Sequence, residues 1–353
     1  MKIALITDTH WGCRGDSMQF ADYFKKFYDD IFFPTLEKEG VKTIIHLGDI
    51  VDRRKYINFL SAKRLREDFM YPAAKRGIHI HVILGNHDVY YKNTNSVNAM
   101  AEMYSADSFI NYYEEPYELN FSGTKILLMP WINSGNYDLC MQKIKDTNAQ
   151  VLFGHLEIKG FEMYKGTPTD HGFDSTIFDK FDIVCSGHFH HKSTRGNINY
   201  LGAPYEITWS DYNDPRGFHI FDTADRSLVF VENPYKMFTK LYYDDENKKV
   251  EDITGKEYNK LSGSFVKVVV KNKTNPYWFD LMIGELEKSG VMDIQVVEDN
   301  YNLNLEDDSD IVNEAEDTIT ILKKYVDQIN TPVDKNKLDL LLRDLYNEAL
   351  SVE

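Results

Sequence analysis

Cysteine is scarce in this chain of 353 residues, and the three that occur are Cys13, Cys140 and Cys185. Their number is odd, and their wide spacing gives no pair of the kind that holds a zinc ion. The sequence therefore excludes a disulfide framework, and we expect three reduced thiols.

Long apolar runs are also missing. No stretch approaches the roughly 20 apolar residues that a membrane span requires. The N-terminal segment turns polar at Thr7 and Asp8, which makes it too short for a signal peptide. We expect a cytoplasmic protein without a membrane partner.

Positive net charge, which is common among proteins that bind nucleic acids, is absent, because the formal net charge is −16. The acidic residues are unevenly spread, however, and residues 291–320 alone carry a net charge of about −10. Residues 51–80 instead carry a surplus of about five positive charges, which include Arg53, Arg54 and Lys55. This stretch could hold a phosphodiester backbone, although a solvated helix face explains each single residue equally well.

Strand-like and helix-like segments alternate along the first 230 residues. Apolar residues recur at helical spacing over about 20–31 and 58–75, and we interpret the aromatic stripe of the first segment as packing. Short apolar runs typical of buried strands occur at 2–7, 43–47, 78–84, 151–155 and 183–187. The alternation predicts an α/β fold in which a sandwich of two sheets is flanked by helices.

The composition changes near Asn233 and Pro234. We expect a main domain at residues 1–233 and a small α+β capping domain at 234–303, with two strands around a helix. Residues 304–353 are interpreted as an acidic linker followed by two amphipathic C-terminal helices. We expect the last helix to bury its apolar face against a partner, with packing against its own domain as the alternative.

Polar side chains follow the carboxyl ends of the apolar runs, where α/β folds gather their ligands. His10 comes two residues after Asp8, and His190 two residues after His188, so each pair points the same way on an extended segment. The full set comprises two carboxylates, one amide and four imidazoles: Asp8, His10, Asp49, Asn86, His155, His188 and His190.

This donor set predicts a site for two divalent metal ions. Mixed oxygen and nitrogen donors suit manganese, iron or zinc better than calcium or magnesium. Two ions about 3.5 to 4 Å apart can activate a water and neutralise a phosphate during in-line displacement. Asp49 is the natural ligand to be shared by both ions. We interpret the other histidines of this part as structural: His46, His79, His81, His171, His191 and His219.

His87 directly follows one of these donors and is left without a metal to bind. We assign it to the substrate, where an imidazole can stabilise the transferring phosphate or protonate the leaving oxygen. Asp52, three residues after Asp49, could hold His87 in orientation and keep it protonated. A turn carboxylate is an equally good interpretation of Asp52.

Five motifs of this chain resemble those of the calcineurin-like metallophosphoesterases over about residues 1–230. They are Asp8-Thr9-His10, Gly48-Asp49-Ile50-Val51-Asp52, Gly85-Asn86-His87-Asp88, Gly154-His155 and Gly187-His188-Phe189-His190. Within that superfamily, Tyr200-Leu201-Gly202-Ala203-Pro204 and Asp214-Pro215-Arg216-Gly217-Phe218 are similar to SbcD-type nuclease subunits of double-strand-break repair, phage recombination endonuclease subunits among them.

This resemblance implies a manganese-dependent nuclease that processes DNA ends, with the seven donors as ligands and His87 as the catalytic histidine that faces the phosphate. It also implies a homodimer, and a coiled-coil ATPase partner of the SbcC type that binds the C-terminal helices. If a phage encodes the chain, its compartment is the host cytoplasm. One departure concerns Asp52 and Arg53, which also resemble the protein phosphatase pattern, although Arg54 stands where phosphatases have glycine.

Two other functions compete with a DNA exonuclease or endonuclease. The same metal chemistry allows a phosphatase that acts on proteins or small phosphomonoesters. A scaffold without catalysis, which only docks a partner through its terminal helices, is the third hypothesis, and the intact donor set argues against it.

Overall fold

The computed structural model describes residues 1–298 except 165, 166, 255 and 256, together with Val326, Lys335, Lys337, Leu338 and Leu341. Residues 1–207 and 211–297 form one compact unit. The helices expected within 304–353 lie outside the described residues, apart from those five positions.

The first of two six-stranded sheets has the strand order β14-β13-β1-β2-β3-β4. The strands from β1 to β4 run parallel, while β13 and β14 pair antiparallel at the other edge. The strands are β1 (Lys2–Ile6), β2 (Thr43–His46), β3 (His79–Ile83), β4 (Ile110–Tyr113), β13 (Gly217–Asp222) and β14 (Leu228–Glu232).

The second six-stranded sheet has the order β11-β12-β10-β7-β6-β5. Its four inner strands are parallel, and an antiparallel strand closes each edge. The strands are β5 (Tyr117–Phe121), β6 (Thr124–Met129), β7 (Val151–His155), β10 (Ile183–Gly187), β11 (Ser193–Arg195) and β12 (Ile198–Tyr200).

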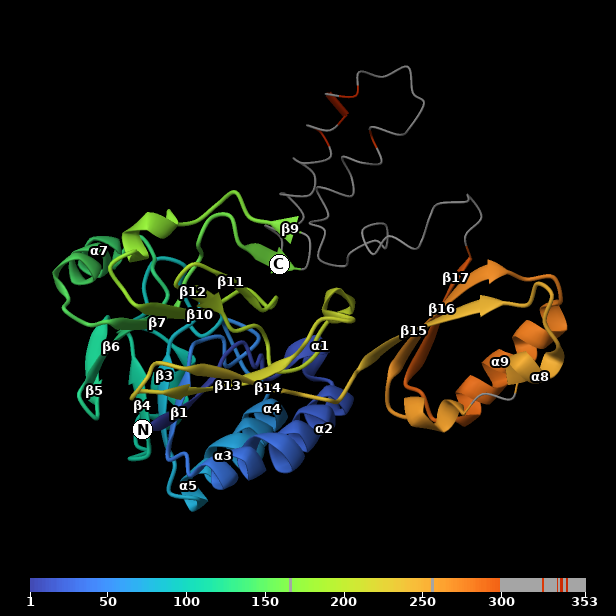
Figure 1. The fold of residues 1–353 in the computed structure, drawn as a ribbon, viewed down its shortest axis with the longest axis horizontal. Coiled ribbons are helices and arrows are strands. Elements are labelled where there is room, and N and C mark those ends of the chain that lie inside the picture. The colour runs from blue at the N-terminus through green and yellow to red at the C-terminus, as the bar shows by residue number, and fades with distance from the viewer. Residues whose placement is uncertain are drawn as a thin grey trace. The chain divides into compact units, whose positions relative to one another are not determined.

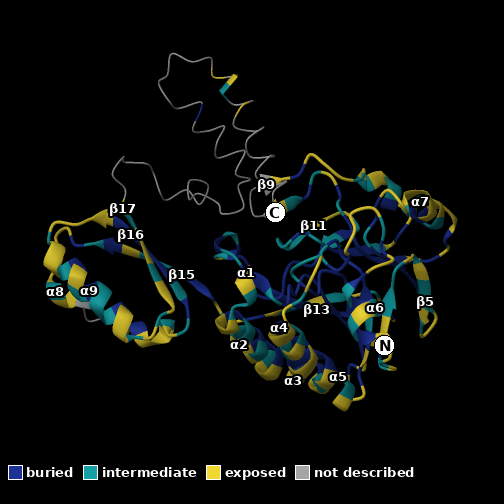
Figure 2. Cartoon of the chain, turned by 180° about the vertical axis from the view of Figure 1, so that it is seen from behind, coloured by how far each residue is buried: buried dark blue, intermediate teal, exposed yellow. Residues whose placement is uncertain are grey.

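The two sheets pack face to face around one apolar core. Ile3, Ile45 and Ile83 come from the first sheet, and Leu128 and Phe153 come from the second. All five side chains are fully buried. Because the parallel strands of both sheets are buried on two faces, their sequences are continuous apolar runs. Figure 2 shows most of these central strands as buried ribbon.

One layer of helices covers the outer face of the first sheet (Figure 1). Phe32 packs on Phe218 of β13 with ring centroids 4.7 Å apart, and Phe69 contacts the ring of His46 in β2. The predicted aromatic stripe is therefore packing. The layer consists of α2 (Met18–Phe27), π-helical η1 (Tyr28–Phe32), α3 (Phe33–Glu39), α4 (Phe59–Arg64), π-helical η2 (Leu65–Met70) and α5 (Tyr71–Lys75).

The outer face of the second sheet is covered by α7 (Tyr137–Asp146) and by the 3-10 helix η3 (Ser175–Phe178). Cys140 and Ile144 of α7 are buried in one cluster with Leu152 and Val184 of the sheet. Shorter elements of this part are α1 (Cys13–Asp16), α6 (Ala99–Tyr104), η4 (Trp209–Asp211) and the hairpin β8 (Glu162–Tyr164) with β9 (Thr167–Pro168). All three cysteines are buried and free, as expected.

A three-stranded sheet with the order β15-β16-β17 follows, with helices on one face (Figure 1). It has a buried cluster of its own, which includes Tyr243, Val268 and Leu286. The sequence predicts the last two strands and the longer helix, but not the first strand. The elements are β15 (Phe238–Asp244), α8 (Val250–Thr254), η5 (Tyr258–Leu261), β16 (Phe265–Asn272), α9 (Pro276–Lys288) and β17 (Asp293–Glu298).

The predicted fold class is confirmed: the main body is a two-sheet α/β sandwich flanked by helices. Among the described residues, no helix combines the length and the apolarity that a membrane crossing demands.

Candidate metal centre

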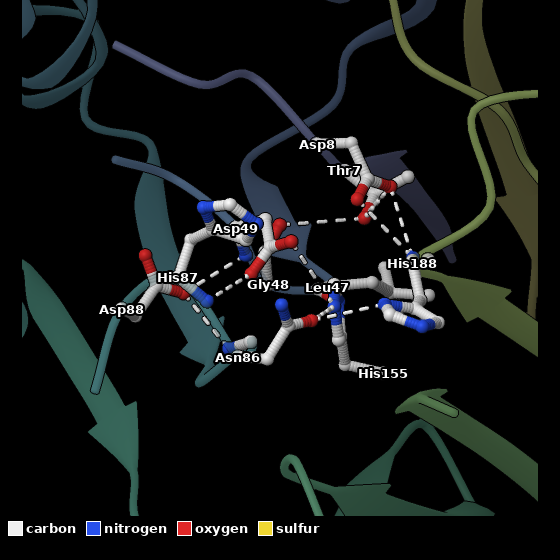
Figure 3. A network of polar contacts seen from close by, with 12 residues as sticks. Thr7, Asp8, Leu47, Gly48, Asp49, Asn86, His87, Asp88, His155 and His188 are labelled. Carbon is white, nitrogen blue, oxygen red and sulfur yellow. Dashed lines mark hydrogen bonds and ion pairs between the residues drawn. The ribbon is translucent and has the colours of Figure 1, made fainter. Parts of the chain in front are cut away.

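The predicted donors meet where the carboxyl ends of five parallel strands converge (Figure 3). The loops after β1 and β2 stay paired beyond the strands, because Asp8 N donates to the carbonyl of Gly48 over 3.0 Å. The two sheets are joined at the same point, since His188 N lies 3.1 Å from Asp8 Oδ2. Residues that are far apart in the chain thus lie side by side.

One group of donors consists of Asp8, His10 and His190, whose ligand atoms all lie within 4.8 Å of one another. The Nε2 atoms of His10 and His190 are 3.1 Å apart. Here two imidazole nitrogens face each other beside a carboxylate. This arrangement of donor atoms is typical of a cation site.

A second group consists of Asp49, His155 and His188, again within 4.8 Å of one another. Asn86 joins it, because its Oδ1 lies 3.0 Å from His155 Nε2 and 2.9 Å from His188 Nδ1. The other ring nitrogen of His155 donates to the carbonyl of Leu47 at 2.8 Å. Such a backbone contact fixes the ring of a metal-binding histidine and points its free nitrogen at the ion.

Asp49 lies between the two groups. Its Oδ2 is 3.4 Å from His155 Nε2 and 3.9 Å from His10 Nε2, so one carboxylate oxygen faces both sets of donors. The chemistry of the whole donor set therefore fits two divalent cations with a shared carboxylate.

Glycines next to the donors allow the strand ends to come this close. A Cβ atom on Gly187 would lie 2.0 Å from Thr7 Oγ1, and one on Gly85 would lie 2.2 Å from Asp49 Oδ1. No side chain fits at either position without displacing a neighbouring donor residue.

Four of the donors have left-handed backbone conformations, which are rare for residues other than glycine. Their φ values are 52° at Asp8, 43° at His10, 53° at Asp49 and 85° at His188. Each costs about 1 to 3 kcal/mol and persists only where the surrounding structure enforces it. The fold thus imposes strained backbone on the residues that carry the donor atoms.

The charged members of the two groups shift one another's pKa values. Burial alone would lower the pKa of His10 and of His155. Asp52, Asp49 and Asp8 outweigh burial at His10, and Asp49 and Asp8 outweigh it at His155, so that both pKa values rise to about 9. Burial and the neighbouring imidazoles instead lower the pKa of His188 to about 3. Burial opposes the low pKa of Asp49, yet the imidazoles of His155, His87 and His10 hold it well below its usual range.

Asp88 organises the loops that carry the donors, a role the sequence does not reveal. Its carboxylate accepts hydrogen bonds from the backbone N–H of Gly85, Asp49 and Ile50 at 2.8 Å each, and from that of Val51 at 3.2 Å. It therefore ties the loop after β2 to the loop after β3. Burial and the charge of Asp49 raise the pKa of Asp88 to about 7.

His87 lies beside the second group, where its backbone N–H donates to Asp49 Oδ1 at 2.7 Å. Its ring Nδ1 lies 2.5 Å from the backbone carbonyl of Asp52. Asp52 thus contacts the ring of His87 through its backbone carbonyl and not through its carboxylate. That carboxylate instead faces His10, with Oδ1 3.5 Å from Nδ1. Burial lowers the pKa of His87.

The three predicted DNA contacts line a cleft of about 140 Å³ together with Tyr56 and Tyr90. Arg53 is already paired, because its Nη1 donates to Asp16 Oδ2 at 2.7 Å. Arg54 differs, since its Nη1 is buried without a hydrogen-bond partner among the described residues. Lys55 is exposed.

Two further residues touch the candidate ligands, and of these only Arg216 stands in a motif quoted from the sequence. Arg216 is buried, pairs with Asp211 and Asp214, and donates to the backbone carbonyl of His190. Trp131 lies beside His188, with ring centroids 5.1 Å apart. Only the structure reveals these two contacts, because each residue is distant in sequence from the ligand that it touches.

Comparison with known families matches residues 1–192 to the calcineurin-like phosphoesterases. These enzymes use divalent metal ions, and the two donor groups are candidate sites for them.

Two curated relatives extend the match. The chain is 33% identical to exonuclease subunit 1 of Enterobacteria phage T4 over 358 aligned residues, which cover 99% of both chains. It is 29% identical to a subunit of the nuclease SbcCD from Staphylococcus saprophyticus over 109 residues, which cover 29% of both. The family model matches residues 1–192, and the phage exonuclease subunit matches 99% of the chain. The chain therefore belongs to the calcineurin-like phosphoesterase family.

Proposed function

We propose that this phosphoesterase is a dimetal nuclease that hydrolyses phosphodiester bonds at the ends of double-stranded DNA during recombination and repair. The observation that carries the proposal is the position of Asp49 Oδ2, which faces both groups of imidazole and carboxylate donors. A relative of nearly the same length is named an exonuclease subunit.

The residues divide between two cations. Asp8, His10 and His190 would hold one, Asn86, His155 and His188 would hold the other, and Asp49 would be shared. Two bound divalent cations, for which we propose Mn²⁺, supply charge neutralisation for the phosphate and activation of the attacking water. Mixed oxygen and nitrogen donors of this kind suit manganese, iron or zinc better than calcium or magnesium.

His87 acts on the substrate. With Nδ1 held by the carbonyl of Asp52, its Nε2 is the atom that can reach a phosphate oxygen or carry a proton to the leaving oxygen. Asp52 acts as a positioning residue, through its carbonyl on His87 and through its carboxylate on His10.

Substitution of His87 by Asn tests this role. We expect H87N to lower the rate of DNA cleavage about 10²- to 10⁴-fold while two Mn²⁺ per chain still bind. H79N, a change at an exposed histidine of β3, is the matched control and should leave the rate unchanged. Retained cleavage by H87N would remove His87 from the mechanism.

The substrate class is tested by comparing Mn²⁺-stimulated degradation of duplex DNA with release of phosphate from a monoester. We expect degradation of DNA. A chain that turns over only the monoester is a phosphatase of the same family, and the nuclease proposal then fails.

Contacts with DNA are assigned to Arg54 and Lys55 rather than to Arg53. The buried Nη1 of Arg54 has no hydrogen-bond partner among the described residues, whereas Arg53 is committed to Asp16. Each lost phosphate contact reduces the slope of log affinity against log salt concentration by about 0.9. R54Q and K55Q should each show this reduction, and K75Q, at another exposed lysine, should not.

A second copy of the chain is the proposed partner for an exposed apolar patch. Phe59 is 94% exposed, and Leu60, Tyr91 and Val97 are also exposed. Phe59 and Leu60 are the first residues of α4, and Val97 lines a cleft together with Tyr56 and Tyr90. We expect a homodimer in sedimentation experiments and a monomer for F59D. V229D, at an exposed apolar residue of β14, should stay dimeric.

The C-terminal helices expected within 304–353 are proposed to bind a coiled-coil ATPase subunit of the SbcC type. The names of both relatives describe them as subunits of larger nucleases. Deletion of residues 311–353 should abolish capture of such a subunit while cleavage by the isolated chain persists. Capture that survives the deletion would place the interface elsewhere.

A further inference from the structure

Trp131 stands beside the candidate metal centre but offers no ligand atom. It follows β6, and its ring centroid lies 5.1 Å from that of His188 and 6.0 Å from that of His155. The side chain is only partly buried. An indole therefore remains partly accessible next to two of the residues that would hold the second cation.

The backbone of Trp131 is fixed from three sides. Its N–H donates to the carbonyl of Leu84, at the end of β3, over 2.8 Å. Its own carbonyl accepts hydrogen bonds from the side-chain amides of Asn95 and Asn136, at 3.0 Å each. The residue is thus anchored to both sheets.

These asparagines belong to a larger amide network. Asn133 Nδ2 donates to Asn95 Oδ1 at 2.9 Å, and Asn98 Nδ2 donates to the carbonyl of Asn95 at 3.0 Å. Asn95, Asn98 and Asn133 are buried. Buried polar networks whose members are paired rigidify the segments that they join. The backbone that carries the indole is therefore held in place before any substrate arrives.

The chemistry of this position suits a planar ligand. In the proposed mechanism, the metal ligands and His87 act on the phosphate. The group that is attached to this phosphate is then the part of the substrate next to the indole. In DNA that group carries a nucleobase, and an aromatic side chain binds the face of any base by stacking, without regard to its sequence. Aromatic residues lose little conformational entropy on binding, which favours them as fixed platforms.

We propose that Trp131 is a stacking platform for the nucleobase adjacent to the scissile phosphate, so that it positions the strand end over the metal centre. This inference rests on the proposed nuclease function. It makes Trp131 a substrate-contacting residue whose contribution depends on the presence of a base.

The experiment measures kcat/KM of the full Mn²⁺-loaded chain on two duplexes. One carries normal terminal nucleotides, and the other carries abasic residues at the same positions. We expect W131A to lower kcat/KM on the normal duplex about 5- to 150-fold, the range that corresponds to loss of one stacked base. On the abasic duplex, W131A and the wild type should agree within about twofold, because the partner of the indole is missing there.

Further variants separate stacking from support of the fold. W131F keeps an aromatic face and should retain part of the rate, while W131L keeps apolar volume without that face and should behave as W131A. W278F, at a tryptophan of α9, is the matched control and should leave both rates unchanged. All variants should bind the same number of Mn²⁺ ions as the wild type.

Equal losses on both duplexes would assign Trp131 to support of the metal ligands and overturn the proposal, and so would the absence of any loss. If the wild type cleaves neither duplex but releases phosphate from a monoester, the nuclease function itself fails, and the stacking platform falls with it.

Discussion

Asp88 is a single residue that fixes the loops of the candidate metal centre without being one of its ligands. It accepts four backbone hydrogen bonds and lies beneath two candidate ligands, Asp49 and Asn86. A carboxylate is suited to this position because both of its oxygens only accept hydrogen bonds.

Replacement of Asp88 by Asn should therefore be costly. The amide N–H₂ would face backbone N–H donors, which leaves buried donors unpaired. We expect D88N to lower the free energy of unfolding by about 2 to 3 kcal/mol and to weaken Mn²⁺ binding. Chemical denaturation and equilibrium dialysis measure the two effects. D225N, at an exposed turn, should change neither by more than about 0.5 kcal/mol, and equal stability of D88N would contradict the role given to Asp88.

The seven donors could be predicted from the sequence because each follows an apolar run that can only be a buried strand. Trp131 could not, and for Asp88 and Arg216 the motifs did not indicate the contacts, since these depend on segments that the fold brings together. Asp52 was placed near His87 correctly, but a pattern of residue types does not distinguish a backbone carbonyl from a side-chain carboxylate.

At the scale of the strand and its terminal loop, the donors meet only if the ends of neighbouring strands approach one another closely. A Cβ atom on Gly187 would lie 2.0 Å from Thr7 Oγ1, 2.9 Å from the carbonyl of Leu47 and 3.0 Å from Asp8 Oδ2. A substitution there must displace Thr7, the loop after β2 or the end of β10, which carries His188.

We therefore expect G187A to lose one of the two Mn²⁺ ions and most DNA cleavage. Metal analysis of the purified variant gives the stoichiometry. G284A, within α9, is the matched control, because a Cβ there meets nothing within 4 Å. It should gain about 0.4 to 1 kcal/mol of stability and keep both ions. Two bound ions in G187A would show that the strand ends tolerate a wider separation.

Glu206 provides a pH-dependent contact at the start of β15. Its Oε2 accepts hydrogen bonds from the N–H groups of Met237 and Phe238 at 2.6 and 2.8 Å, and burial raises its pKa to about 7. The unfolded chain loses this proton near pH 4.5. The native state therefore holds more protons between these values, so that stability falls as the pH rises toward 7.

E206Q should remove this dependence, since glutamine does not ionise. Between pH 5 and pH 8, the wild type should lose about 2 to 3 kcal/mol of unfolding free energy relative to E206Q. Urea denaturation at both pH values measures the difference. If the unfolding free energies of the wild type and E206Q differ by the same amount at pH 5 and at pH 8, Glu206 does not titrate in this window.

The sequence predicts helices and strands where a single hydrophobic periodicity dominates the segment. The helical stripes at 20–31 and 58–75 correspond to continuous helical segments, although each contains a π-helical turn that amphipathicity does not indicate. β15 was missed because its burial along Phe238–Asp244 is irregular, and its identity comes from its parallel pairing with β16.

For the whole molecule, metal binding and folding are coupled, because the donors come from both sheets. At a free Mn²⁺ concentration of 100 times the dissociation constant, each site should add about 2.7 kcal/mol to the free energy of unfolding. Denaturation with Mn²⁺ and with EDTA measures this gain. D49N should lose it, whereas D225N should keep it. Identical stability with Mn²⁺ and EDTA would contradict a metal site of this kind.

The central position of β1 has a consequence for synthesis. Its neighbours are β2 and β13, and Asp8 meets His190 only after some 180 further residues have been made. A nascent chain on the ribosome therefore has no complete catalytic centre until nearly the whole sandwich has emerged. A fragment released before that point lacks His190 and one complete group of donors.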